Sequence, residues 1–155
     1  MAAKHIFPLY SQNTGLEITP EIKANTGKAK KVGIVMLRFF LIQPPADGKT
    51  TQVKFQLEPW EAFDLSMRMN KMFREGGKEK ITHKFTPLGG KEVVTNVTVE
   101  KWEREEEEWS WYCCRPRRCV YLCPSWQRQH FSVLYAAEFL KFLSTRQGWV
   151  DREAA

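Results

Sequence analysis

The residues best suited to chemistry are four cysteines followed by a histidine: Cys113, Cys114, Cys119, Cys123 and His130. Thiolates and imidazoles bind structural zinc, usually as two pairs with two to four residues inside each pair. Cys113 and Cys114 are adjacent, and adjacent side chains of a strand point to opposite faces, so they cannot easily share one metal. Pairing Cys114 with Cys119 across a hairpin would put Cys114, Cys119 and Cys123 on one face, where His130 could complete a zinc site. We favour the alternative of small packing residues, and we expect no metal and no cofactor.

Catalysis has little support in this sequence. A cysteine–histidine pair needs a fold that brings the base to the thiol, and no local signature positions His5, His83 or His130 for this role. His83 alternates with apolar residues, a pattern typical of a half-buried histidine. The acidic run Glu103–Glu108 is too uniform to separate an acid from a base, and no phosphate-binding glycine loop precedes a helix. We therefore predict a protein that is not an enzyme.

The strongest functional pattern is the interleaving of aromatic and basic residues in one predicted hairpin. Pairing residues 109–114 with residues 119–123 places Tyr112 opposite Tyr121, on the face away from the apolar residues of both strands. The loop between these strands carries Arg115, Arg117 and Arg118. Proteins that bind single strands stack bases on aromatic rings and place cations along the phosphates. The alternative is an ordinary cross-strand aromatic pair that stabilises the hairpin.

Further aromatic and basic residues could extend this surface. Phe40 shares a face of its predicted strand with Arg38, and Trp102 follows Lys101. The residues that we expect to contact nucleic acid are Arg38, Phe40, Lys54, Lys80, Lys84, Trp102, Tyr112, Arg115, Arg117, Arg118 and Tyr121. The sequence contains neither the aromatic signature of the RNA-recognition motif nor a helix-turn-helix.

Composition agrees with a polyanionic partner. The 155 residues suit one domain, and the 43% hydrophobic content suffices for a core. A net charge of +6 favours polyanions through counterion release, although it could serve only solubility. The longest apolar run, Ile34–Ile42, is interrupted by Arg38 and is shorter than the roughly 20 residues of a membrane span. Met1–Tyr10 lacks the apolar stretch of a secretory signal. We expect a cytoplasmic protein with no membrane contact and mostly reduced cysteines.

The first half of the chain supplies an arm, a hairpin and a helix. Residues 1–29 show no clear periodicity, so we expect an extended basic arm. Lys31–Gln43 is rich in Val, Ile and Phe and predicts a strand, with Val35, Leu37, Phe39 and Leu41 facing the core. Thr51–Leu57 alternates apolar and polar residues, and the Pro-Pro and Asp-Gly turn between the two segments predicts a hairpin. A helix is expected from Pro59 to about Glu75, ending at a glycine pair. Its apolar stripe, expected to pack against the sheet, is Trp60, Phe63, Met67 and Phe73, widened by Leu65, Met69 and Met72.

The second half supplies four strands and a final helix. The strands are expected over residues 79–85, 93–102, 109–114 and 119–123, and the helix over residues 132–147 with Gly148 as its C-cap. Short connections make neighbouring strands antiparallel. The prediction is an α+β fold with an antiparallel sheet of about six strands in the order ββαββββα and helices covering one face. The expected divisions are an arm over 1–29, one domain over 30–148 and a tail over 149–155.

The final helix also suggests self-association. Phe139 and Phe142 lie off the stripe formed by Val133, Ala137 and Leu140, so the helix presents more apolar surface than one domain needs. We expect a homodimer or a swapped C-terminal contact. The alternative is that the sheet and the first helix bury both stripes.

Two segments resemble the ThermoDBP-like single-stranded DNA-binding proteins. They are LEPWEAFDL over Leu57–Leu65, and ITHKF over Ile81–Phe85 followed by VTVEKWER over Val97–Arg104. The resemblance covers about residues 31–145, and it implies binding of single strands, independent of sequence, in a cleft with aromatic and basic lining. The cysteine-rich hairpin departs from that family.

These observations favour sequence-independent binding of single-stranded DNA through stacking and phosphate neutralisation. The alternatives are an RNA-binding protein, a protein–protein interaction module that acts through the C-terminal helix, and a zinc-dependent or thiol enzyme.

Overall fold

The chain forms eight strands and two helices in the computed structural model, which describes residues 6–11, 13–24, 31–43, 46, 52–103, 107–115, 118–122 and 129–153. The first sheet, sheet A, contains β1 (Phe7–Tyr10), β2 (Thr14–Ala24), β3 (Lys31–Leu41) and β4 (Gln52–Leu57). The second sheet, sheet B, contains β5 (Gly77–Phe85), β6 (Val93–Glu103), β7 (Glu107–Arg115) and β8 (Arg118–Leu122). Helix α1 (Pro59–Glu75) joins the sheets, and helix α2 (Gln129–Glu153) closes the chain.

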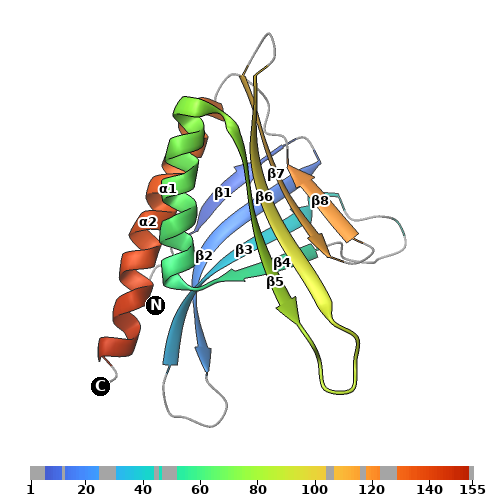
Figure 1. Cartoon of the computed structure of the whole chain (residues 1–155), viewed down its shortest axis with the longest axis vertical. Helices are drawn as coiled ribbons and strands as arrows, with labels where there is room; N and C mark the ends of the chain where they lie inside the picture. The colour runs from blue at the N-terminus through green and yellow to red at the C-terminus, as the bar shows by residue number, and fades with distance from the viewer. Residues whose placement is uncertain are drawn as a thin grey trace.

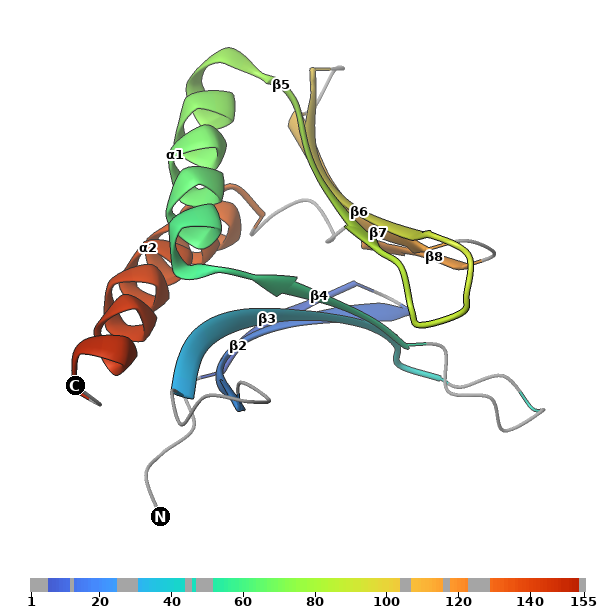
Figure 2. The ribbon, with the colours of Figure 1, turned by 60° about the horizontal axis from the view of Figure 1, so that its bottom comes forward.

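The predicted α+β class, with antiparallel strands and two helices, is confirmed. All neighbouring strands are antiparallel, and each sheet follows chain order, so β4 lies at one edge of sheet A and β5 at one edge of sheet B. The strands that we expected in one sheet are divided between two, because α1 intervenes after β4 and β5 starts a new edge. Sheet B arches over sheet A, and the two helices stand side by side at one end of the sheets (Figures 1 and 2).

The expected N-terminal arm contributes two strands of sheet A instead. Leu16 and Ile18 in β2 are fully buried, and Leu9 in β1 is nearly so. These apolar residues alternate with Gly15 and Glu17, which gives the period of two that a half-buried strand requires. Gly15 also has a packing reason to lack a side chain, because a Cβ there would overlap the ring of Phe40 on β3.

The core lies between the two sheets and the helices. The core-facing residues predicted for β3 and β4 include Val35, Leu37, Phe39, Val53, Phe55 and Leu57, and all six are buried. Trp111, Cys113 and Val120 bury the inner side of sheet B, as their alternation predicts. One continuous hydrophobic cluster joins these residues to both helices, so the sheets and the helices form a single packed unit.

Helix α1 begins and ends where the sequence predicts, but it turns a different side to the core. Its buried residues are Ala62, Leu65, Ser66, Met69 and Met72. Trp60 is 65% exposed, Phe63 44% and Met67 50%, while Phe73 is partly buried against the core. At 3.6 residues per turn, the exposed trio and the buried set occupy opposite sides of the helix. The expectation that Trp60, Phe63 and Met67 pack against the sheet is therefore wrong.

Helix α2 is longer than predicted, since it continues through Gly148 to Glu153. Gly148 is not a C-cap: one glycine inside a helix costs about 1 kcal/mol relative to alanine, which is too little to end a packed helix. The buried Gln147 fastens α2 to sheet A, where its Nε2 donates to the carbonyl oxygens of Glu21 and Ile34, both at 2.7 Å. In the described part of the chain, neither helix is long and apolar enough to cross a membrane.

Candidate functional site

A cleft of about 740 Å³ lies where the edge of sheet A meets the edge of sheet B. Strand β4 lines it with residues 54–56 and strand β5 with residues 83–85. Val93 and Thr95 of β6 and the first turn of α1 complete most of the wall. Because both edge strands and a helix start converge there, side chains from 54 to 95 in the sequence share one surface. We call this hollow the edge cleft.

Two large aromatic side chains line the edge cleft and remain open to solvent. Trp60 at the start of α1 is 65% exposed, and Phe85 at the end of β5 is 67% exposed. Burial of an aromatic ring of this size is favourable, and stacking a base on it contributes about 1–3 kcal/mol to the binding free energy. The edge cleft therefore offers planar apolar surfaces that the protein itself does not cover.

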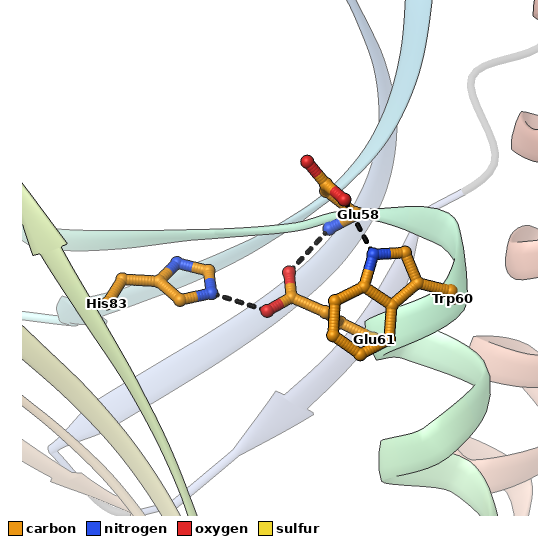
Figure 3. A network of polar contacts seen from close by, with 4 residues as sticks. All are labelled: Glu58, Trp60, Glu61 and His83. Atoms are coloured by element: carbon orange, nitrogen blue, oxygen red, sulfur yellow. Dashed lines mark hydrogen bonds and ion pairs between the residues drawn. The ribbon is translucent and has the colours of Figure 1, made fainter.

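A polar network fixes the start of α1 against β5 (Figure 3). The indole Nε1 of Trp60 donates to Oε2 of Glu58 at 2.6 Å, and the backbone N–H of Glu58 donates to Oε2 of Glu61 at 2.9 Å. The other Glu61 oxygen lies 2.7 Å from Nε2 of His83 on β5. His83 in turn stacks on Phe55 of β4, with ring centroids 4.3 Å apart. The network thus links α1 and both sheet edges, and it holds the indole of Trp60 beside a carboxylate.

A second polar contact joins α1 to β5 about two helical turns after Glu61. Arg68 donates to Oε2 of Glu79 at 2.9 Å and forms an ion pair with Asp64 at 2.8 Å. The hydrogen bonds to Glu79 and Asp64 raise the pKa of Arg68 above its ordinary value. The contact between Arg68 and Glu79 helps to fix the orientation of α1 relative to β5, the strand that lines the edge cleft.

Cations and further rings continue from the edge cleft onto the outer face of sheet A. Lys54 lines the edge cleft and is the register partner of Arg38 on β3. Arg38 pairs with Glu17, and its guanidinium lies 5.0 Å from the centroid of the Phe40 ring. Phe40 meets Tyr10 edge-to-face at 6.4 Å. We call the surface formed by Tyr10, Arg38, Phe40 and Lys54 the sheet A platform.

The structure distributes the residues predicted to contact nucleic acid over three places: the sheet A platform, the edge cleft and sheet B. Arg38, Phe40 and Lys54 share the sheet A platform, and Lys84 lines the edge cleft near Glu92, at 3.7 Å. In sheet B, Lys80 is paired with Thr98 and Thr98 with Tyr112. Tyr112 is paired with Tyr121, so the four residues form one row across the sheet. The predicted pairing of Tyr112 with Tyr121 is confirmed at the backbone. Whether any of these residues contacts nucleic acid stays a prediction.

Three further predicted contact residues are placed by their backbone alone, and a fourth is not described. The structure gives the backbone of Trp102 in β6, Arg115 in β7 and Arg118 in β8, which lie toward strand ends. Arg117 lies outside the described residues.

The sequence reading missed the aromatic and acidic residues of the edge cleft, namely Glu58, Trp60, Glu61, His83 and Phe85. Trp60 was read as core because α1 carries apolar residues on two sides. Glu58 is the N-cap of α1 and Glu61 lies three residues later. This spacing is that of a capping box, so it could have indicated from the sequence that both side chains bond the start of the helix.

Cys114 is disulfide-bonded, so it departs from the expectation of mostly reduced cysteines, whereas Cys113 is not part of a disulfide. A sulfur in a disulfide cannot serve as a thiolate ligand, so Cys114 does not fit the zinc site considered from the sequence. Among the described residues, no group of three or more cysteine, histidine or acidic residues is placed to hold a metal. Cys123 and the side chains of Cys119 and His130 lie outside the described part of the structure.

Comparisons identify the fold but no close relative. No protein-family model matches the sequence, and no curated protein matches it. The structure is similar to that of WHY1 from Arabidopsis thaliana, with a TM-score of 0.58 and 14% identity over 96% of this chain and 88% of that protein. It is also similar to the plant transcriptional regulator PBF-2, with a TM-score of 0.52 and 13% identity over 100% of this chain and 90% of that one.

A third similar structure is WHY3 from Arabidopsis thaliana, with a TM-score of 0.48 and 18% identity over 99% of this chain and 97% of that protein. At identities below 25%, the structural similarity to WHY1 and PBF-2 establishes a shared fold and does not establish a shared function. The first two structures support the fold that the resemblance implied, and they do not show the ThermoDBP-like family specifically.

Proposed function

We propose that this protein binds single-stranded nucleic acid, with DNA favoured, through the edge cleft and the sheet A platform, without catalysis or a cofactor. Bases would stack on the exposed rings of Trp60 and Phe85, while Lys54, Arg38 and Lys84 neutralise phosphates. The observation that carries the proposal is the exposure of two large rings in a cleft whose rim bears lysines. Stacking needs unpaired bases, so duplexes are poor ligands.

The charge balance and the fold support the same function. The net charge of +6 provides the long-range attraction that brings a polyanion to the surface. One protein of similar fold, PBF-2, is a transcriptional regulator, and regulation of transcription acts on nucleic acid or on proteins bound to it. A row of Lys80, Tyr112 and Tyr121 across sheet B would supply a second stacking surface on the same principle.

The test is a titration of labelled single-stranded and duplex DNA of the same sequence, with binding measured by fluorescence anisotropy at several salt concentrations. We expect tighter binding of the single strand and a linear decrease of log K with log salt. RNA of the same sequence is the third ligand, and equal or tighter binding of RNA would contradict the preference for DNA. Equal affinity for single strands and duplex would contradict stacking as the mechanism.

A protein–protein interaction module is the second candidate, and the helices favour it. Phe63 and Met67 on α1 and Tyr135 and Phe142 on α2 are all exposed, at 44–66% of their surfaces. Exposed apolar residues on helices mark contact surfaces when they are contiguous. This surface is compatible with nucleic-acid binding at the edge cleft, because none of these four residues lines the edge cleft.

A further inference from the structure

We propose that the edge cleft prefers guanine among the bases that stack on Trp60, and that the Glu58 carboxylate selects it. This inference rests on the proposed function, since it concerns one base of a bound single strand. The sheet A platform would still bind strands of any sequence, so the preference acts at one position. The observation behind it is the hydrogen bond that places the Glu58 carboxylate against the indole of Trp60 (Figure 3).

Glu58 has the geometry of a base-edge acceptor. Its Oε2 accepts from Nε1 of Trp60 at 2.6 Å, so the carboxylate lies at the rim of the ring on which a base would stack. An ionised carboxylate offers about four acceptor sites and no donor. In the capping box at the start of α1, the Glu58 side chain also accepts from the backbone N–H of Glu61. These two contacts leave about two of the four acceptor sites, and Glu58 is exposed at the cleft, so it retains capacity for a ligand.

Glu61, in contrast, is not available to accept hydrogen bonds from a ligand. One of its oxygens faces His83 and the other accepts from the backbone N–H of Glu58, and its side chain is only 13% exposed. Glu61 therefore holds the wall of the edge cleft in place, and Glu58 meets the ligand.

The carboxylates of Glu58 and Glu61 also determine whether the base or the phosphate of a nucleotide lies next to the start of α1. A helix N-terminus carries about half a positive charge and ordinarily attracts phosphate. At α1 this position already holds Glu58 and Glu61, whose charges exceed that of the helix dipole and repel an anion. The phosphates are thus directed to Lys54 and Lys84, which leaves the base to face Glu58.

Guanine fits a carboxylate better than the other bases. Its Watson–Crick edge places two donors, N1–H and the N2 amino group, side by side, where both oxygens of one carboxylate can accept. Cytosine and adenine offer one amino group next to a ring nitrogen acceptor. The N3–H of thymine lies between two carbonyl oxygens, which the carboxylate repels. The order of preference is therefore guanine, then cytosine and adenine, then thymine.

The experiment compares oligothymidine with the same strand carrying one central guanosine, deoxyinosine or cytidine, by fluorescence anisotropy at fixed salt. We expect the guanosine strand to bind roughly fivefold tighter or more than oligothymidine. Deoxyinosine, which lacks the N2 amino group, should fall between them. Glu58→Gln keeps an oxygen for Trp60 but lacks the second acceptor, so it should reduce the guanosine advantage to less than about twofold.

The matched control is Glu92→Gln, which removes the same charge from an exposed residue outside the lining of the edge cleft. It should leave the guanosine advantage intact. Equal binding of all strands by the unmodified protein would overturn the guanine preference while leaving the proposed function standing. A guanosine advantage that survives in a folded Glu58→Gln variant would overturn the role of Glu58. Failure to bind any strand would instead overturn the proposed function.

Discussion

Arg38 and Lys54 lie directly opposite each other on β3 and β4 and point to the same outer face of sheet A. Like charges in this arrangement are destabilising by a few tenths of a kcal/mol up to about 1 kcal/mol. Glu17 offsets one of the two charges through its ion pair with Arg38, and the other is left at the rim of the edge cleft. Two adjacent cations that cost stability are expected where a polyanion binds.

Replacing Lys54 should therefore affect binding more than folding. Lys54→Gln should reduce the slope of log K against log salt by about 0.7 on a single strand, since one phosphate contact is lost. The free energy of unfolding should stay the same or rise slightly. The measurements are anisotropy titrations over a salt series and urea denaturation. The control is Lys71→Gln, which removes the same charge from an exposed position on α1; an equal change of slope there would assign the effect to net charge.

The attachment of α2 to sheet A should depend on Gly33 and Gln147. A Cβ at Gly33 would lie 3.0 Å from the Cα of Gln147 and overlap its carbonyl oxygen. Gly33→Ala should lower the free energy of unfolding by about 1–3 kcal/mol, and Gln147→Ala by about 1–2 kcal/mol, because two carbonyl oxygens lose a donor. Urea denaturation measures both. Arg146→Ala, at an exposed neighbouring position, should change stability by less than about 0.5 kcal/mol.

The sequence predicts individual elements well because their signals are local. Pro59 and Gly76 bound α1 through backbone constraints, a run of β-branched and aromatic residues identifies β3, and alternation identifies β4. The strand β2 escaped prediction because glycine, threonine and proline interrupt the alternation of Leu16 and Ile18. These breaks read as loop in the sequence, whereas pairing with β3 accommodates them.

The site was harder to predict because it depends on tertiary packing. Helix α1 has apolar residues on two opposite sides, and only the position of the sheets decides that Met69 is buried and Trp60 exposed. The edge cleft also requires that the strands divide into two sheets, so that β4 and β5 both become edges. Local periodicity carries no information about how the strands divide into sheets. The register of the hairpin that pairs Tyr112 with Tyr121 does follow from local periodicity.

Self-association should depend on α2. Phe139, expected to be available to a partner, stacks on Phe7 at 5.4 Å, so among the described side chains of this helix the large exposed hydrophobic residues are Phe142 and Tyr135. We expect a homodimer at micromolar concentration, and Phe142→Glu should dissociate it. Sedimentation equilibrium distinguishes the two states. A mass of one 18.2 kDa chain across that range would show that the unmodified protein is a monomer.

The tyrosines of sheet B test a second stacking surface. Replacing Tyr112 and Tyr121 together by alanine should cost about 1–3 kcal/mol per stacked base, and the loss should persist at high salt because stacking releases no counterions. Replacing Arg115, Arg117 and Arg118 should instead flatten the salt dependence, by about 0.7 per lost phosphate contact. Unchanged binding by a folded double tyrosine variant would restrict the site to the edge cleft and the sheet A platform.

The rings of the edge cleft provide the sharpest test of the mechanism. Trp60→Ala and Phe85→Ala should each weaken binding of a single strand by about 1–3 kcal/mol. Both side chains are about two-thirds exposed, so the free energy of unfolding should change little, by roughly 0.5 kcal/mol or less. The salt slope should be unaltered, which separates this loss from that of Lys54→Gln. Phe63→Ala is the matched control, because Phe63 is an exposed ring one turn further along α1 and does not line the edge cleft. If Phe63→Ala weakens binding as much as Trp60→Ala does, the strand follows the outer side of α1 and not the edge cleft.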